Sequence, residues 1–464
     1  MERWLRSPWV LALAAPAVAA SALAGALLGI SACGARTELT IFGDEAASGD
    51  GSGASSGDSA AGTTGRSGPP SSGQVATSGG APSGYEVAST GEAGSAGSSS
   101  DSADAGSCSS RCSGACVDLG SDPNNCGMCG NACGPGLLCM DPGTCGNPPS
   151  CQAVSSRGTT DCGPDASAES CCSSPVVPGG TFFRNYDGAT YAQMDGLATI
   201  SSLRVDKFEI TVGRFREFVT ATLRTGWLPH PASGRHSHLN VGRGLVNFPG
   251  TIPPSYEPGW QPSWNVNLAT SEAQWDASLS CGPLATWTSA PGANENRPIN
   301  CIDWYEAYAF CIWDGGFLPS DAEWNYVASG GSEQRVFPWS VPPMSTAIDC
   351  AHANYSGLGG GYCSPGGTNS VGSESPVGDG KWGQSDLGGN VWEWALDVGS
   401  GGPCVDCIDT LQLPRGPETP LLDDARMIRG GGLGASFTLQ SSAINDDDAT
   451  DRNIQQGARC ARAP

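Results

Sequence analysis

The sequence predicts an α+β fold with little regular secondary structure, preceded by a disordered tether and a small disulfide-rich module. The 67 glycines and 34 prolines among 464 residues are too many for one uniformly packed domain. Cysteines become dense from Cys108 onward, and every tryptophan except Trp4 and Trp9 follows residue 176. We therefore expect the large hydrophobic core in the C-terminal part of the chain.

Charge and cysteine content restrict the compartment and the partners. With 46 acidic and 23 basic residues the formal net charge is -23, which disfavours nucleic acid as a partner and electrostatic attraction to anionic lipids. The chain has 21 cysteines but 4 histidines, a ratio typical of disulfide-bonded exported proteins rather than cytosolic zinc proteins.

The N-terminus predicts export and lipidation. Two arginines precede an apolar run over residues 9–30, as in a signal peptide, although a transmembrane helix is the alternative. The run ends in Ile30-Ser31-Ala32-Cys33, which resembles the lipobox of bacterial lipoproteins, where the cysteine thiol takes a diacylglyceryl group. We expect a signal peptide at 1–32 and a lipid on Cys33 as the sole membrane attachment. Gly34, where Asp would favour inner-membrane retention, favours an outer-membrane lipoprotein of the cell envelope, periplasmic or surface-exposed.

Composition divides the next part of the chain into three segments. Residues 33–107 are mostly Gly, Ser, Ala, Thr and Asp and cannot form a core, so we expect a lipidated N-terminus followed by a disordered tether. Residues 108–151 resemble the cysteine-rich modules of the stigma-specific protein family, where disulfides replace a core. Cys126-x-x-Cys129 could also suit a metal, but this module contains no histidine. Residues 152–175 are expected to form a cysteine-containing linker.

Local patterns predict one strand and three helices beyond residue 176. Residues 203–210 are rich in β-forming side chains, and Thr211 can cap a helix with apolar residues at helical spacing. A second helix is expected over about 303–314, because apolar residues recur at helical spacing until a Gly-Gly pair ends it. Ser320-x-x-Glu323 is a capping box for a third helix.

A series of short motifs runs through residues 176–464. They are Arg204-x-x-Lys207-Phe208-Glu209-Ile210-Thr211-Val212, Arg297-Pro298-Ile299-Asn300-x-x-Asp303-Trp304-x-x-Ala307, Leu318-Pro319-Ser320-Asp321-Ala322-Glu323-Trp324, Phe337-Pro338-Trp339, Asp386-Leu387-Gly388-Gly389-Asn390-Val391-Trp392-Glu393-Trp394, Arg429-Gly430-Gly431 and Gly457-x-Arg459-Cys460. In kind and order they resemble the formylglycine-generating enzyme, or sulfatase-modifying factor, family. The resemblance implies that family's variant of the C-type lectin fold, with little regular structure and a Trp-rich core.

The resemblance implies a calcium site at the Asn390-Val391-Trp392-Glu393-Trp394 motif. A carboxylate between two tryptophans is costly to bury unless it is paired or binds a cation, and calcium takes carboxylate and carbonyl oxygens. The implied ligands are Gly388, Gly389, Val391 and Glu393. The alternative is a Glu393 satisfied by local N–H groups.

A second implied calcium site has a poorer match. Asn369 stands where the family has Asp, and loss of an anionic ligand weakens the affinity for a hard cation. The implied ligands are Asn354, Tyr355, Asn369 and Val371.

The family's pair of copper-binding active-site cysteines is missing from this chain. Carried over by the motif, the two positions fall on Ala435 and Gln440, and no cysteine occurs between Cys407 and Cys460. Neither residue offers the soft sulfur that Cu(I) needs, so we expect no copper and assign no catalytic residue. The acidic segment 445–451 would suit a cation or a basic partner, or is an ordinary solvated loop.

Two functions from different classes remain open. The first is a surface protein that reuses the fold for binding or structure, with a protein or glycan ligand at the cell surface. The second is a formylglycine-generating oxidoreductase-like enzyme with a rearranged site, acting on exported sulfatases or another protein substrate. Family membership favours an enzyme, whereas the missing thiols favour the first.

The resemblance also implies that Cys311 pairs with Cys460, which would tie an early helix to the last strand. The alternative is two buried free thiols, which are rare in exported chains. The other cysteines of the domain then permit the short-range pairs Cys281–Cys301, Cys350–Cys363 and Cys404–Cys407.

Overall fold

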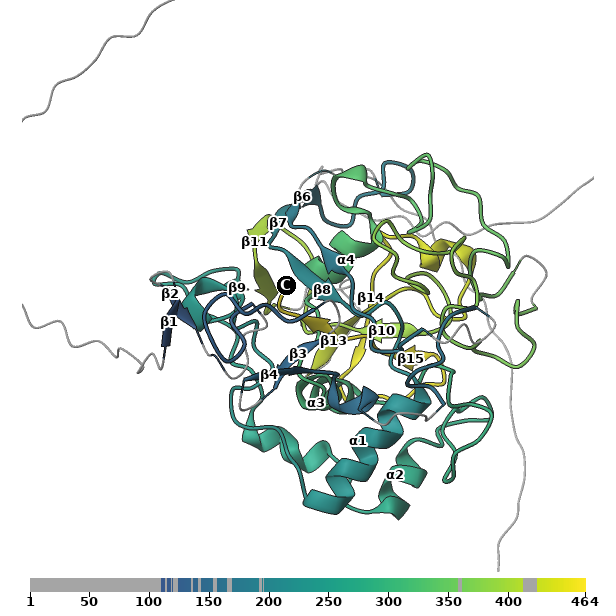
Figure 1. The fold of residues 1–464 in the computed structure, drawn as a ribbon. Coiled ribbons are helices and arrows are strands. Elements are labelled where there is room, and N and C mark those ends of the chain that lie inside the picture. The colour runs from purple at the N-terminus through teal and green to yellow at the C-terminus, as the bar shows by residue number, and fades with distance from the viewer. Residues whose placement is uncertain are drawn as a thin grey trace, which may run out of the picture. The chain divides into compact units, whose positions relative to one another are not determined.

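A computed structural model describes most of residues 110–464 (Figure 1). The gaps are 113–114, 118, 120–123, 135–136, 141–142, 153–156, 165–168, 192–193, 195, 358–360 and 412–423. The predicted signal peptide, Cys33 and the tether lie outside the described residues. Within the described part of the chain, no helix has both the length and the apolarity needed to cross a bilayer.

The α-helices begin at side-chain caps, which are local features of the sequence. The Thr211 hydroxyl accepts a hydrogen bond from the Arg214 N–H, and Gly226, with φ 66°, ends that helix. Two further helices begin with complete capping boxes, so all three predicted helices are confirmed. A short fourth helix capped by Ser271 was not predicted. The helices are α1 (Val212–Thr225), α2 (Glu272–Ser278), α3 (Trp304–Trp313) and α4 (Asp321–Ala328).

Short strands form several small sheets rather than one large one. The largest has the order β14 (Asn445–Asp448), β13 (Ala425–Arg429), β10 (Trp392–Trp394) and β15 (Gln456–Gly457). Two three-stranded sheets have the orders β11 (Cys404–Val405), β7 (Leu197–Ile200), β6 (Gly180–Phe183) and β16 (Ala461–Arg462), β8 (Leu203–Val205), β5 (Val176–Val177). Two-stranded sheets pair β12 (Cys407–Asp409) with β9 (Val246–Phe248), β1 (Ser110–Cys112) with β2 (Ala115–Val117), and β3 (Leu138–Met140) with β4 (Thr144–Gly146). The α+β class with little regular structure is confirmed.

The strand expected over 203–210 is shorter than predicted. β8 ends at Val205, because Asp206 turns inward to the guanidinium groups of Arg214 (3.0 Å) and Arg462 (3.2 Å). A buried ion pair therefore ends a segment whose side chains otherwise favour a strand.

Aromatic side chains fill the main core between the helices. Phe215 and Phe218 of α1 contact Trp275 of α2 edge to face, and Phe310 of α3 lies 5.8 Å from Phe215 between ring centroids. Figure 1 shows α1 and α2 together at one end of the domain, whereas α4 lies among the strands. A second cluster, which includes Trp324 of α4, packs against β5 to β8. The Trp-rich core expected from the sequence lies in these clusters.

The segment expected to be a linker at 152–175 belongs to the globular domain. Its cysteines form the pairs Cys151–Cys172 and Cys162–Cys171. Arg214 of α1 donates to the Cys171 carbonyl (3.1 Å). The globular domain therefore begins before the predicted boundary at residue 176, because the backbone of this segment contacts α1.

Nine disulfides join described cysteines. The four pairs expected in the C-terminal domain are all present, and Cys311–Cys460 spans 149 residues. The N-terminal module contains Cys112–Cys129, Cys126–Cys139 and Cys133–Cys145. Three of its cysteines, Cys126, Cys133 and Cys145, have sulfur atoms that all lie within 4.8 Å of one another, and each of them is disulfide-bonded.

Candidate functional site

The two positions that correspond to the family's active-site cysteines lie at the ends of one tight turn. A short 3-10 helix, η6 (Ser436–Leu439), separates Ala435 from Gln440, and Thr438 closes the turn by donating to the Ala435 carbonyl (2.7 Å). An added Cβ on Gly431 would lie 2.4 Å from the Thr438 carbonyl oxygen, so this close approach requires glycine. We call residues 435–440 the η6 turn.

The η6 turn offers no sulfur ligand. Ala435 is exposed, and half-buried Gln440 donates to the Thr190 hydroxyl (3.0 Å). Every cysteine between residues 176 and 464 is already in a disulfide. The residues present therefore do not fit the copper–thiolate centre that the family resemblance implies.

A buried ion pair links β13 to α4 and to the segment that follows the η6 turn. The Arg429 guanidinium binds both oxygens of Asp321 at 2.6 and 2.8 Å and donates to the Ala443 carbonyl (3.0 Å). Burial raises the pKa of Asp321, but Arg429 outweighs burial and lowers this pKa to about 2. Within the Arg-Gly-Gly motif, Gly431 contacts Thr438 of the turn, whereas Arg429 binds the segment after it.

Glu393 of β10 is fully buried and paired with a cationic side chain. The Arg459 guanidinium donates to both of its carboxylate oxygens, at 2.6 and 2.7 Å, and the Trp324 indole N–H donates to one of them (2.7 Å). Among the other implied ligands of the first calcium site, the Gly389 N–H donates to the Gly430 carbonyl (2.8 Å). These contacts satisfy Glu393 without a cation.

Further buried carboxylates surround that ion pair. Glu209 accepts from the Asn390 side chain (2.7 Å) and the Val391 N–H (3.2 Å), and Asp386 accepts from the Gly372 N–H (2.6 Å). Burial first, and then the charges of Asp386 and Glu393, raise the pKa of Glu209 well above its usual range. We call Glu209, Asp386, Glu393 and Arg459 the Arg459 cluster; it holds three buried carboxyl groups and one guanidinium.

The second implied calcium site lies against this cluster. Asn390 joins the two, because its side-chain oxygen accepts from the Asn369 N–H (2.8 Å) and the Asn354 side chain (3.3 Å). The carbonyl oxygens of Tyr355 and Val371 accept backbone N–H groups at 2.9 and 3.2 Å.

Glu374 is an acidic residue of this site that the sequence analysis missed. The Asn369 side chain donates to one Glu374 oxygen (2.6 Å), and the other oxygen is buried without a hydrogen-bond partner. Burial raises the pKa of Glu374, and its charge adds to burial in raising the pKa of Asp386. An orphaned buried oxygen and surplus negative charge fit a hard cation such as calcium. Asp386 and Glu209 stand inside the quoted motifs, but no motif contains Glu374.

A buried histidine lies beside the ring of Phe317. Glu257 and Glu323 accept from the two ring nitrogens of His236, each at 3.0 Å, and the Phe317 ring centroid lies 3.8 Å from that of His236. Burial lowers the pKa of His236, but the two carboxylates outweigh it and raise this pKa to about 10. His236 thus holds the loop before β9 to the start of α4.

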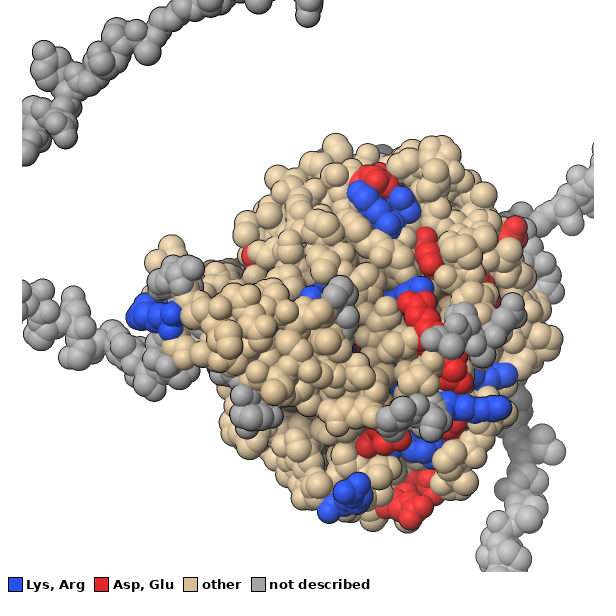
Figure 2. Space-filling model, viewed as in Figure 1, with Lys and Arg blue, Asp and Glu red and all other residues tan. Residues whose placement is uncertain are grey.

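The acidic segment is partly a strand rather than a loop. β14 pairs with β13, with Asp447 opposite Arg426. A hydrogen bond with Asp447, together with partial burial, raises the pKa of Asp451 to about 6. Figure 2 shows acidic and basic side chains scattered on the visible face, without a continuous basic patch.

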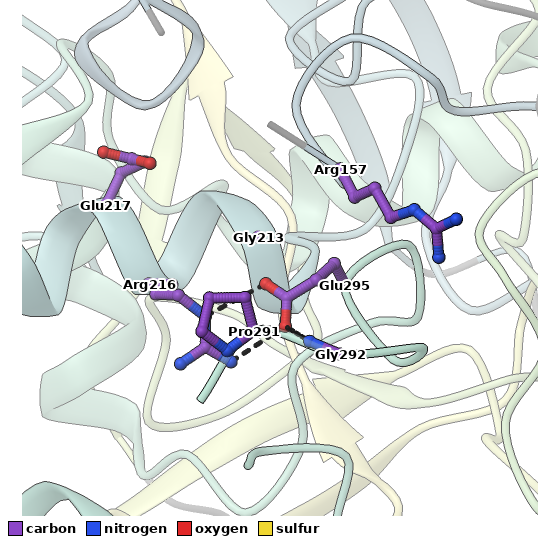
Figure 3. A pocket seen from close by; sticks show the side chains of 7 residues that line it. All are labelled: Arg157, Gly213, Arg216, Glu217, Pro291, Gly292 and Glu295. Atoms are coloured by element: carbon purple, nitrogen blue, oxygen red, sulfur yellow. Dashed lines mark hydrogen bonds and ion pairs between the residues drawn. The ribbon is translucent and has the colours of Figure 1, made fainter. Parts of the chain in front are cut away.

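Two cavities lie away from the predicted site residues. One of about 450 Å³ lies beside α1, where Arg216 and Glu295 form a bidentate ion pair with contacts of 3.0 and 2.8 Å (Figure 3). Another of about 150 Å³ is lined in part by Trp264, Trp304 and Arg426. None of the residues lining these two cavities belongs to the η6 turn or the Arg459 cluster.

The curated proteins similar to this chain include formylglycine-generating enzymes and a protein named as an inactive form. The chain is 27% identical over 310 residues to the formylglycine-generating enzyme of Thermomonospora curvata, covering 62% of this chain and 93% of that protein. It is 26% identical over 247 residues to inactive C-alpha-formylglycine-generating enzyme 2 of Mus musculus, covering 48% and 68%. Among solved structures, PvdO from Pseudomonas aeruginosa matches with 20% identity and a TM-score of 0.38, covering 67% of this chain and 100% of that one.

The family assignment follows from the extent of the match. Residues 160–464 match the sulfatase-modifying factor enzyme 1-like domain. The matched range begins within the segment 152–175, which contacts α1. This match covers more than half of the chain and contains both the η6 turn and the Arg459 cluster. The chain therefore belongs to the sulfatase-modifying factor enzyme 1-like family.

Proposed function

We propose that this protein is a non-oxidase member of its family, which uses the domain for binding or structure at the cell envelope. The observation that carries the proposal is the η6 turn, where Ala435 and Gln440 occupy the cysteine positions and no free thiol lies elsewhere in residues 176–464. An oxidase of this family needs two thiolates for Cu(I), and disulfide sulfur cannot replace them.

The surface around the η6 turn supports a protein or glycan ligand. Phe437 in the turn is 65% exposed and Tyr362 is 43% exposed. Ser356 forms bridges with both Tyr362 and Ala435, so the two aromatic residues flank one short stretch of backbone. Exposed aromatic side chains offer apolar faces to sugar rings or to protein side chains. The net charge of -23 argues against nucleic acid.

Calcium is proposed as a structural ion. Asp386, Glu374 and the Asn369 side chain would hold it between the two implied sites, where Glu374 supplies the negative charge that Asn369 lacks. A bound divalent cation would neutralise buried carboxylates that a single guanidinium leaves uncompensated.

The location of the protein forms part of the same proposal. Ile30-Ser31-Ala32-Cys33 supports lipidation of Cys33 and attachment to the outer membrane, on the periplasmic or the outer face. Cys33→Ser should leave the precursor unprocessed and unlabelled by radioactive palmitate. Palmitate labelling that is unchanged in this variant would contradict the assignment.

The test of the non-oxidase function is incubation with a sulfatase-type cysteine peptide, Cu(I) and O2. We expect no aldehyde in the peptide by mass spectrometry, under conditions where a formylglycine-generating enzyme converts it. The alternative function, an oxidoreductase that acts on exported sulfatases through a rearranged site, is supported by the 27% identity to an enzyme. Aldehyde formation would overturn our proposal and favour that alternative.

A further inference from the structure

Cys404 and Cys407 form a disulfide unlike the others in the domain. Three positions separate them in sequence, compared with 13, 20 and 149 for the other three pairs of the C-terminal domain. Cys404 is half-buried, Cys407 is 2% exposed, and the intervening Val405 is 63% exposed. Cys404 is thus the more exposed of the two cysteines, and the exposed apolar side chain of Val405 follows it in sequence.

The backbone between the two cysteines is held by contacts that do not involve sulfur. Asp406 has φ 42°, and its carboxylate accepts from the Ser201 N–H and the Ser201 hydroxyl, each at 2.7 Å. Its N–H donates to the Thr199 carbonyl (3.0 Å), and its carbonyl accepts from the Val246 N–H (2.9 Å). Because β7 and β9 fix this loop from both sides, the two cysteines should stay close after reduction.

This disulfide also adds little to the stability of the fold. A disulfide stabilises mainly by restricting the unfolded chain, and the effect grows with the length of the loop that it closes. A loop of this size restricts little. Reduction of this pair should therefore leave the domain folded.

A guanidinium N–H points at the accessible sulfur. Arg184, which is 1% exposed, donates through Nη1 to the Gly401 carbonyl (3.0 Å) and to Cys404 Sγ (3.9 Å). Its other terminal nitrogen, Nη2, forms the ion pairs with Asp321 and Asp409. Nη1 thus remains directed at the sulfur, and such a hydrogen bond strengthens when the acceptor becomes a thiolate.

From this geometry we propose that Cys404–Cys407 is a thiol–disulfide exchange site, whose partner is a dithiol peptide or protein. A partner thiolate attacks Cys404 Sγ, the bond between the two sulfurs breaks, and Cys407 leaves as a thiolate that takes a proton. The second thiol of the partner, once deprotonated, attacks the partner's first sulfur, which is bonded to Cys404 in the mixed disulfide. This step releases Cys404 as a thiolate. Two electrons pass from the partner to this protein, and the partner gains one disulfide.

The first test is a redox titration of the full chain in glutathione buffers, followed by acid quenching, thiol labelling and peptide mapping. We expect Cys404–Cys407 to be reduced at a glutathione ratio that leaves Cys350–Cys363 oxidised, with the near-ultraviolet circular dichroism unchanged. The Cys350–Cys363 pair is the control, because Cys350 is exposed and Cys363 is half-buried. Reduction of Cys404–Cys407 only together with Cys350–Cys363, or only on unfolding, would overturn the proposal.

The second test separates the roles of the two cysteines. Cys407→Ser leaves Cys404 as a single thiol, and Cys404→Ser leaves Cys407. We expect the Cys404 thiol to be alkylated at least tenfold faster than the Cys407 thiol. The pH at which its alkylation rate is half-maximal should lie below about 8.5, the pKa of an ordinary cysteine. Equal rates in the two variants would contradict the assignment, as would failure of the wild-type protein to oxidise a peptide with a Cys-x-x-Cys dithiol.

Discussion

The Arg459 cluster and the η6 turn are both built on motifs of the family, but they differ in what this chain has kept. The cluster retains Glu393 and Arg459 as a bidentate ion pair in the core. The turn retains its arginine and glycines, whereas both positions for sulfur have changed. This chain therefore keeps the family's buried ion pair at one site and offers no sulfur ligand at the other.

The physical cost of change explains the difference. Removing one partner of a buried ion pair leaves an uncompensated charge, whereas replacing a surface cysteine leaves the backbone turn intact. Ala435 and Gln440 need only to tolerate the backbone of the η6 turn, which Gly431 contacts. The predictions below test this contrast, from the largest expected effect to the smallest.

The disulfide next to the Arg459 cluster should be the most stabilising of the domain. Cys311 and Cys460 close a loop of 149 residues, for which loop-closure entropy gives about 5 kcal/mol. The double variant Cys311→Ser/Cys460→Ser should lose most of this in urea unfolding. The matched control, Cys404→Ser/Cys407→Ser, should lose about 2 kcal/mol at most. Equal losses would show that the long-range bridge does not hold the last strand.

The ion pair itself should give the next largest effect. Arg459→Met leaves Glu393 buried without its partner and should cost about 3–5 kcal/mol of unfolding free energy. The double variant Glu393→Gln/Arg459→Met removes both charges and should regain part of the loss.

At the turn, Gln440→Ala should cost less than about 0.5 kcal/mol, because it removes one half-buried hydrogen bond. If Gln440→Ala lowered the unfolding free energy as much as Arg459→Met, the two sites would not differ in their tolerance of substitution.

Local signals in the sequence were sufficient for three of the four α-helices described. Thr211 and Ser320 act as caps through contacts three residues away, so the sequence alone identifies them. The cap at Asp303 was not predicted, although its contact is equally local. The Arg-Gly-Gly motif also leads directly to Ala435.

Features that depend on contacts between residues distant in sequence could not be predicted from local sequence patterns. The end of β8 depends on Arg462, 256 residues beyond Asp206, and the role of 152–175 depends on α1. Glu374 joins the candidate site through Asn369 and Asp386, although it lies in no recognised motif. Burial and long-range pairing decide these features, and neither has a short-range pattern.

The buried His236 predicts a loss of stability at alkaline pH. Its pKa is about 10 in the folded protein and about 6.5 when unfolded, so the folded state binds the proton more tightly. The stabilisation is complete below pH of about 6.5 and disappears as the pH rises through about 10. Urea unfolding should show a loss of about 3.5 kcal/mol between pH of about 7 and 10. His236→Gln should remove this pH dependence, whereas the exposed-site control His230→Gln should retain it.

Chelation tests whether the negative charge beside Arg459 holds calcium. A ligand present at 100 times its dissociation constant stabilises the native state by about 2.7 kcal/mol, so a calcium chelator should lower the melting temperature of the wild-type protein. Glu374→Gln should weaken this dependence, whereas Asp451→Asn should not. Identical melting with and without chelator in the wild-type protein would show that the cluster is stable without metal.

The smallest effect on stability should come from restoring the sulfur at the η6 turn. Ala435→Cys/Gln440→Cys alters one exposed and one half-buried side chain, and should change the unfolding free energy by less than about 0.5 kcal/mol. If the turn keeps the geometry of its family, the two thiols should bind Cu(I) in anaerobic competition with a chromogenic chelator, and Ala435→Cys alone should bind it far more weakly. Copper binding by the double variant would show that the backbone of the η6 turn can still place two thiols on one Cu(I) ion. A double variant with free thiols that binds no copper would show instead that the turn has changed shape together with its side chains.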